Sequence, residues 1–576
     1  MPTDAVSLSS RRMTAAVEPE RAARRLRVRP EATLVAGVAA VVGALTILPL
    51  GYLVWRAFSA DGRPTVGNFA SAYGGDRLGS MAWSSLWFTV GSTVVAVGLG
   101  AALAYIVVRT DVPGRKLLFV AGLAPLALPG VLYTIAWIFL AAPRSGILNA
   151  ALGRGTLDVF SPAGMVVVEG LHLAPLAFLL LAAAFRALDP AFEESALAAG
   201  VPPRTVLRRI TLPLVAPALG AAVLIVAIRA LESFEVPALL GIPSGVWLLT
   251  SRIWRALSEY PPDLGAAAAY SVPLLALSAA GVLVLARFAR RRRAYETITG
   301  RGFRPPVVRL GRWRGPTAAC AWLYAVIATG LPLLALIYVS TQPFFTAPSR
   351  ETLSSITLRP YADTLSDART LESLWNSTLL GIGAATATVA LAAVVAWIVL
   401  RTDIPGRRIL DELSFLPIAV PGIVLGLALL ALYVRSPVPI YGTAWILLIA
   451  YVTRFLPFAS RAAAVSMGQV GRELEDAARV SGVGWWRTFR RVLFPLILPG
   501  LAAAWLYVFV LSLRELSSSI LLYSPGNDVL AVRIWESYNQ GRFAELSALG
   551  ILLVVGFAVA SLIAYRVATR LRTRPL

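Results

Sequence analysis

Long apolar runs alternate along the chain with shorter segments that hold most of the charged residues. Most runs have about 20 residues or more, the length that an α-helix needs to cross about 30 Å of hydrocarbon. In lipid such runs must be helical, because no water is available to bond the backbone. A core helix of a large soluble protein would explain one run, but not all of them together. The pattern predicts about twelve spans, near residues 33–57, 83–108, 117–141, 164–187, 212–231, 265–288, 317–340, 376–400, 410–433, 441–462, 496–515 and 545–566.

Composition supports the same fold class. Of 576 residues, 57% are hydrophobic and 15% are charged, and the mean hydropathy is +0.71. A soluble domain carries about 25% charged residues, so this chain is expected to be an all-α polytopic membrane protein with lipid around it. The single cysteine excludes a disulfide framework and a thiolate metal site. We expect no metal and no cofactor in this chain.

The positive charges indicate an orientation. The net charge of +22 is compatible with nucleic-acid binding, but the arginines cluster between the apolar runs, as they do in cytoplasmic loops of membrane proteins. The arginine-rich loops lie at 109–116, 188–211, 289–316, 401–408 and 467–491. We therefore expect a multi-pass protein of the cell membrane, with both termini in the cytoplasm and no nucleic-acid partner.

The two halves of the sequence repeat each other. RTDVPGRK at 109–116 recurs as RTDIPGRR at 401–408, PLALPG at 125–130 as PIAVPG at 417–422, and RIW at 252–254 as RIW at 533–535. Each half has about six spans, so the repeats are parallel and the transport path is expected between them. The predicted domains are a cytoplasmic arm at 1–31, transmembrane domains at 32–288 and 317–566, a cytoplasmic linker at 289–316 and a tail at 567–576.

A second repeated element lies between the fourth and fifth spans of each half. In both copies an acidic residue precedes a glycine by six positions, and a proline follows that glycine by thirteen. Small residues let a short helix lie in a partner's groove, glycine permits a turn with positive φ, and proline is favourable at the start of the next helix. The candidate residues are Glu194, Ala196, Gly200, Leu212 and Pro213 in the first copy, and Asp476, Ala477, Gly482, Phe494 and Pro495 in the second.

This element resembles the "EAA" signature of the permease subunits of ATP-binding-cassette (ABC) importers, which depend on a binding protein. Ser195, Asp476, Val492 and Phe494 depart mildly from the pattern. The resemblance implies a coupling helix in each half that docks onto one copy of an ABC ATPase, and a solute-binding protein on the outer side. An ordinary alanine-rich connector is the alternative for a single copy.

Catalytic machinery is not apparent in the sequence. Lys116 is the only lysine and is not part of a P-loop, so we expect a transport subunit without enzyme activity that relies on a separate ATPase. An ion-gradient-driven transporter is the alternative of a different class, because charged groups inside spans often mark ion pathways. Those groups are Glu169, His172 and Arg454 in the fourth spans, and Glu232, Glu235, Arg514 and Glu515 after the fifth.

The sequence LESFEVPALLG at 231–241, followed by RIW, resembles the fused ferric-iron permeases. The resemblance implies iron(III) as the solute, with thiamine, polyamines and oxyanions as alternatives among relatives. We expect Glu232 and Glu235 near the outer gate, where acidic groups favour a cation. Arg514, Glu515 and His172 complete the candidate translocation path. The alternative is that the acids are paired with arginines of neighbouring segments.

Overall fold

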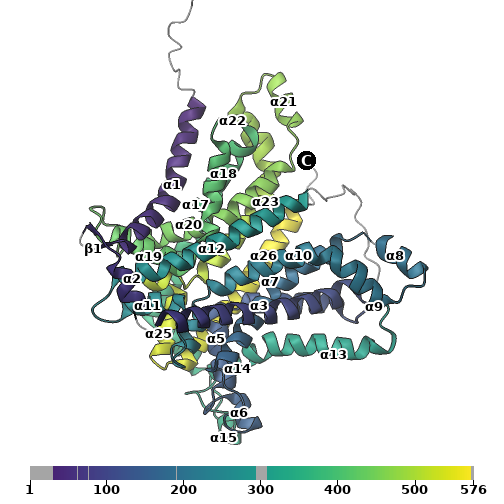
Figure 1. Cartoon of the computed structure of the whole chain (residues 1–576), viewed down its shortest axis with the longest axis vertical. Helices are drawn as coiled ribbons and strands as arrows, with labels where there is room; N and C mark the ends of the chain where they lie inside the picture. Colours follow the sequence, from purple (N-terminus) through teal and green to yellow (C-terminus); the bar gives the residue numbers. More distant parts are fainter. Residues whose placement is uncertain (1–29, 61, 75–76, 190, 294–307, 573–576) are drawn as a thin grey trace, which may run out of the picture.

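The computed structural model describes residues 30–60, 62–74, 77–189, 191–293 and 308–572 (Figure 1). These residues are mostly helical, with one antiparallel hairpin formed by β1 (Ser59–Ala60) and β2 (Arg63–Pro64). The predicted all-α fold is confirmed. The arm at 1–29, linker residues 294–307 and tail residues 573–576 lie outside the described part of the chain.

The first half begins with a long helix and ends with another. Its helices are α1 (Pro30–Ala57), α2 (Gly67–Tyr73), α3 (Arg77–Arg109), α4 (Arg115–Leu123), η1 (Ala124–Ala127), α5 (Gly130–Ala141), α6 (Ile147–Leu152), α7 (Pro162–Ala187), α8 (Ala191–Ala198), α9 (Pro203–Val206), η2 (Leu207–Thr211), α10 (Leu212–Leu231), η3 (Pro237–Gly241), α11 (Leu249–Ser258) and α12 (Leu264–Arg293). The first residues of the predicted linker, 289–293, thus continue α12.

The second half repeats this order. Its helices are η4 (Gly311–Trp313), α13 (Arg314–Ala325), η5 (Val326–Gly330), α14 (Leu331–Ser340), α15 (Arg350–Ser354), α16 (Arg359–Ser366), α17 (Ala368–Arg401), α18 (Arg407–Phe415), η6 (Leu416–Ala419), α19 (Gly422–Tyr433), α20 (Ala444–Gly468), α21 (Glu473–Val480), α22 (Trp485–Thr488), η7 (Phe489–Leu493), α23 (Phe494–Leu513), α24 (Ser519–Leu522), α25 (Leu530–Asn539) and α26 (Phe543–Arg572).

Nine helices of the described residues are long and apolar enough to cross a membrane, or up to 11 if each of two bent pairs is one span. The last predicted span coincides with α26, whose apolar described part is Phe543–Val559. A multi-pass membrane protein is therefore supported, and the count of twelve stays a prediction.

Two spans that the sequence predicts as continuous are broken. The helices on either side of Pro129 and Pro421 meet at 98° and 107°. Each proline has extended backbone, with ψ of 142° and 141°, just before the glycine that begins α5 or α19. Proline lacks the N–H that would continue a helix, so each repeated Pro-Gly pair ends one helix and begins another inside an apolar run. Apolar composition alone does not reveal such a break.

The first helix of each half packs against the other half. Helix α1 contacts α18 and α19, while α13 contacts α3 and α4. Ala321 of α13 is buried in a core cluster that α3, α4, α7 and α10 otherwise form. The sequence repeats at 32–288 and 317–566 thus interlock in space rather than forming two separate bundles.

Candidate functional site

The repeated acid–glycine element folds in the same way in both halves. Helices α8 and α21 end just before Gly200 and Gly482, which have φ of +80° and +74°. After each glycine the next N–H bonds back to the helix, from Val201 to Ala196 and from Val483 to Ala478, both at 3.0 Å. This is a left-handed helix end of the kind that favours glycine, as the sequence predicts.

The prolines of the element were expected to begin the next helix after a turn. Pro213 and Pro495 do lie at the second position of α10 and α23. However, the helix already runs from Pro203 to Leu231 in one case and from Phe489 to Leu513 in the other. A π-helical turn precedes each proline. This wider turn accommodates the missing N–H, so the fifth spans are longer than predicted.

Most candidate coupling residues are solvent-accessible. Glu194, Gly200, Leu212, Pro213, Asp476, Ala477, Gly482, Phe494 and Pro495 are exposed, and Ala196 is half-buried. Two large apolar side chains at equivalent positions, Leu212 and Phe494, are 45% and 39% exposed. We call residues 191–213 and 473–495 the first and second coupling segments. Each presents exposed small and apolar residues.

An ion pair fixes each coupling segment to a long helix, and it is buried in the first half and half-buried in the second. The guanidinium of Arg109, at the end of α3, contacts the carboxylate of Glu193, and both are buried. The Thr211 hydroxyl also donates to Glu193, at 2.7 Å. Sequence reasoning did not connect these residues, although their equivalents recur at the same positions in the second half. The recurrence of an arginine and an acid at equivalent positions in both repeats is therefore the signal that could have identified the pair.

In the second half the equivalent pair is Arg401 with Glu475, at 3.1 Å. Arg401 also donates to the carbonyl oxygens of Met467 and Val470, at 3.0 and 2.6 Å. Each arginine begins the repeated RTD sequence, and each acid directly precedes the acidic residue of the coupling motif. The two repeated motifs are thus parts of one structural unit.

Charged residues gather beside the two broken spans. In the first half Ser233 donates to Glu169 of α7 at 2.9 Å, and Arg229 contacts Glu232 at 3.3 Å. In the second half Arg454 of α20 pairs with Glu515 at 2.9 Å. In both halves a polar pair therefore joins the fourth long helix to the segment after the fifth. We call these residues, with Glu235 and Arg514, the central polar cluster.

The cluster also joins the halves to each other. Arg514 donates to the carbonyl oxygen of Leu126 at 2.5 Å, just before the break at Pro129 in the first broken span. Ser517 donates to Glu235 at 3.5 Å. A Cβ placed on Gly422, at the second break, would lie 2.6 Å from the Arg454 guanidinium. The glycine of the second PG repeat thus allows the close approach of Arg454.

Of the predicted path residues, Glu232, Glu235, Arg514 and Glu515 belong to this cluster. His172 stacks at a tilt on Tyr133, with ring centroids 4.8 Å apart. Its Nδ1 has no hydrogen-bond partner among the described residues. Glu232 and Glu515 are paired with arginines, as the alternative interpretation expects. Within the described residues, no group of three or more His, Cys, Asp or Glu residues is arranged to hold a metal ion.

The repeated RIW sequences meet at the boundary between the halves. The rings of Trp254 and Trp535 lie edge to face, with centroids 5.7 Å apart. Phe234, which is fully buried, stacks on Trp535 at 5.6 Å. Phe234 lies between Glu232 and Glu235 in the sequence. The aromatic trio is therefore continuous with the central polar cluster, and both are built from the two halves together.

The sequence matches known proteins in both halves. A family described as "binding-protein-dependent transport system inner membrane component" matches residues 96–294 and 378–575. The Fe(3+)-transport system permease protein FbpB 2 of Haemophilus influenzae is 25% identical over 83% of this chain and 88% of its own length. The ferric transport system permease protein FbpB of Actinobacillus pleuropneumoniae is 26% identical over 68% of this chain and 56% of its length.

A shorter relative has a different name. A putative 2-aminoethylphosphonate transport system permease protein, PhnV of Salmonella paratyphi A, is 28% identical over 29% of this chain and 62% of its own length.

Proposed function

Since the chain belongs to the family of binding-protein-dependent transport system inner membrane components, we propose that its coupling segments bind two copies of an ABC ATPase. The chain itself supplies the transport path, and a binding protein delivers the solute on the outer side. Both termini and both coupling segments face the cytoplasm in this proposal.

One observation carries the proposal most directly. The two coupling segments have the same helix, the same positive-φ glycine and the same arginine anchor. Most of their motif residues remain exposed despite this anchoring. A segment that is fixed on one side and exposed on the other is suited to receive a partner and transmit its movement. Two such segments fit two ATPase copies.

Co-purification tests this role. The chain is co-expressed with an ABC ATPase subunit of the same source, and Asp476→Lys and Gly482→Pro are compared with wild type. Both changes should remove most of the bound ATPase while the chain stays in the membrane, because one reverses a charge and the other forbids the required positive φ. Glu412→Lys is the control, since Glu412 is exposed on α18 outside both segments. Full ATPase retention by both motif variants contradicts the proposal.

For the solute we propose iron(III). The names of two relatives and the acids Glu232 and Glu235 support a cationic cargo. Uptake of radioactive iron(III) should fall in the double variant Glu232→Gln, Glu235→Gln, while ATPase binding is unchanged. Glu259→Gln is the control, because Glu259 is exposed and pairs with Arg255 outside the cluster. Undiminished iron uptake by the double variant contradicts a role for these acids.

An anionic solute is the second candidate, and the cluster's own pairing favours it. Glu232 and Glu515 are bonded to arginines, whereas the Arg229 side chain is 46% exposed. Arg514 bonds a backbone carbonyl, and an arginine fork is suited to phosphonate or carboxylate oxygens. Transport of labelled 2-aminoethylphosphonate, lost in Arg514→Gln, would select this candidate. Iron(III) uptake without phosphonate uptake would reject it.

A further inference from the structure

The end of the inter-half linker is hydrogen-bonded to the first RTD loop. Thr110 and Val308 form a parallel β-bridge. The Val308 N–H donates to the carbonyl oxygen of Arg109 at 2.8 Å, and the Asp111 N–H donates to that of Val308 at 3.2 Å. Residues almost 200 positions apart are thus joined by backbone bonds, which do not depend on the side chains of the linker.

The side chain of Asp111 extends this contact to the start of α13. Its Oδ1 accepts from the Leu310 N–H at 2.9 Å. Arg314, the first residue of α13, donates to the Asp111 carbonyl oxygen at 3.0 Å. The Arg314 guanidinium is 3.9 Å from the Asp111 carboxylate, so the hydrogen bond from the Leu310 N–H is the closer side-chain contact. Asp111 therefore acts mainly as an acceptor.

The same three-residue loop holds the first coupling segment. Arg109 directs its side chain to Glu193 of α8 and its carbonyl oxygen to Val308. Two bonds from one buried residue therefore link α8 to the linker. A displacement of α8 that pulls on Arg109 must also move this loop, because Arg109 is only 1% exposed and closely surrounded.

Helix α13 is also packed onto the first half, where it contacts α3 and α4. Trp322 approaches the turn at Gly114, where an added Cβ would be 3.8 Å from the indole ring. Ala321 is buried in the core cluster of α3, α4, α7 and α10. The first helix of the second half thus rests on helices of the first half, next to the loop that anchors it.

The second RTD loop makes different contacts in the described part of the chain. Asp403 pairs with Arg407, four residues along the same loop and helix, at 2.8 Å. Arg401 bonds Glu475 and two carbonyl oxygens at the end of the second half's own α20 segment. Equivalent residues therefore hold the linker in one half and the local turn in the other.

We propose that Asp111 is a positioning residue that makes α13 follow the first coupling segment. The first segment then moves helices of both halves, whereas the described side-chain contact of Asp403 stays within its own loop and helix. This inference rests on the proposed function, because it assumes that an ATPase moves the coupling segments. Two contacts carry the inference. Arg109 bonds both Glu193 and Val308, and the Asp111 carboxylate accepts from the Leu310 N–H.

The test uses the full chain with its ATPase in lipid nanodiscs. The chain's single cysteine, Cys320, is exposed on α13 and takes one nitroxide label. A second label is placed in the first coupling segment at Arg204→Cys, an exposed position. Distances between labels are measured without nucleotide and with ATP and vanadate. Asp111→Ala, Asp111→Asn and Asp403→Ala are compared in this background.

In wild type the two labels should keep one distance in both states, because α9 and α13 move together. In Asp111→Ala the fraction of molecules with a shifted distance should rise about fivefold on trapping, the factor expected for losing one hydrogen bond. Asp111→Asn keeps Oδ1 and should restore the wild-type distribution. A role in folding alone would not depend on nucleotide.

Three outcomes overturn the inference: Asp111→Ala behaves like wild type, Asp111→Asn fails to rescue, or Asp403→Ala has the same effect as Asp111→Ala. These outcomes are distinct from failure of the proposed function. If the labelled chain with native Asp111 and the unlabelled chain both retain no ATPase, the proposed function fails before any distance is measured. If ATPase is retained and the distances do not respond to Asp111, the inference alone fails.

Discussion

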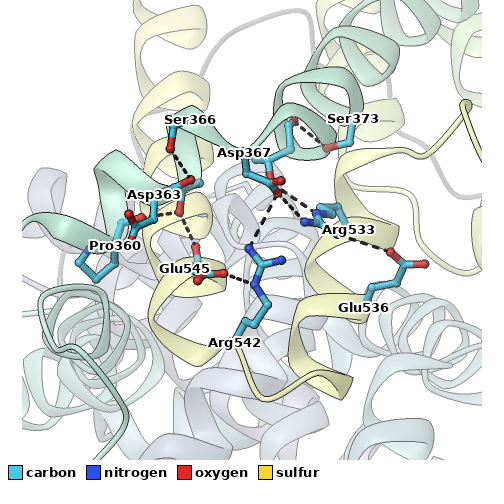
Figure 2. Close-up of polar contacts among 11 residues, drawn as sticks. Pro360, Asp363, Ser366, Asp367, Ser373, Arg533, Glu536, Arg542 and Glu545 are labelled. Carbon is cyan, nitrogen blue, oxygen red and sulfur yellow. Dashed lines mark hydrogen bonds and ion pairs between the residues drawn. The ribbon is translucent and has the colours of Figure 1, made fainter.

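Arg533 donates to the carboxylate of Asp367 at 2.5 Å (Figure 2), and the Arg533 side chain is only 2% exposed. The contact joins α25 to the residue that precedes α17. Thr370 also donates to Asp367, and Arg542 of the loop before α26 lies 3.8 Å from the same carboxylate. This single acid therefore ties together three segments of the second half. The equivalent Arg252 of the first half instead stacks on Trp247, at 4.3 Å.

Removing the buried arginine should destabilise the second half. Arg533→Met deletes charge-assisted hydrogen bonds to Asp367, which contribute about 1.5–3 kcal/mol each, and we expect a loss of about 2 kcal/mol. Thermal unfolding of the purified chain in nanodiscs measures the loss. Arg359→Met is the matched control, because Arg359 is 82% exposed and its pair with Asp363 is solvated. Equal losses in the two variants would show that burial of Arg533 is unimportant.

The same pair predicts a pH dependence. Burial alone would raise the pKa of Asp367, but hydrogen bonds from Thr370 and Arg533, with the charges of Arg533 and Arg542, hold it below the ordinary value of 3.8. A folded-state pKa below the unfolded one adds stability that is complete above pH 3.8 and is lost as pH falls through the folded pKa. Wild type should therefore exceed Asp367→Asn in unfolding temperature at about pH 6, and the difference should shrink in acid. A difference in unfolding temperature between wild type and Asp367→Asn that grows as pH falls below 3.8 would contradict the expected direction.

The Arg109–Glu193 anchor should behave as a coupled unit. Arg109→Met leaves the Glu193 carboxylate buried without its partner, which costs about 3–5 kcal/mol. Glu193→Gln on its own leaves a buried guanidinium and should cost a similar amount, whereas the double variant should recover much of the loss. A double-mutant cycle on unfolding temperature measures the coupling. Additive losses would mean that the two side chains do not depend on each other.

Two features of the site were predictable because they follow from local chemistry. The turns at Gly200 and Gly482 follow from a glycine at the same distance from an acid and a proline in both halves, and positive φ is the reason for glycine there. The apolar runs likewise predict most of the long helices, because membrane thickness sets their length.

Other features were not predictable from one sequence. The breaks at Pro129 and Pro421 lie inside apolar runs, and hydropathy reports composition rather than backbone angle. The packing of α13 on the first half depends on helix partners, and all lipid-exposed helices have similar composition. The Arg109–Glu193 pair joins residues 84 positions apart, and only the parallel recurrence of Arg401 and Glu475 hints at it.

The PG repeats should differ in tolerance to a methyl group. A Cβ on Gly422 would lie 2.6 Å from the Arg454 guanidinium and 2.8 Å from Ser517. A Cβ on Gly130 would meet the Glu235 carboxyl carbon only at 3.4 Å, an ordinary contact. We expect Gly422→Ala to cost about 1–3 kcal/mol through overpacking, and Gly130→Ala much less. Thermal unfolding in nanodiscs separates them, and equal tolerance would show that Arg454 moves freely.

The tryptophans of the two RIW repeats should hold the halves together. Trp254 and Trp535 touch each other across the boundary, and Phe234 packs on Trp535. An aromatic pair of this kind contributes about 0.5–1.5 kcal/mol beyond burial. Losing it should shift the equilibrium between closed and open halves up to about tenfold toward the open state.

We therefore expect Trp535→Ala to raise ATP hydrolysis by the reconstituted complex in the absence of binding protein, because the open arrangement would no longer need that protein to form. Trp535→Phe keeps an aromatic ring and should stay near wild type. Trp445→Ala is the matched control, since Trp445 is 65% exposed on α20 away from the aromatic trio. A reconstituted complex whose basal hydrolysis is the same in Trp535→Ala and wild type would show that this contact does not resist opening. In that case the paired acids and arginines beside it would have to hold the halves closed.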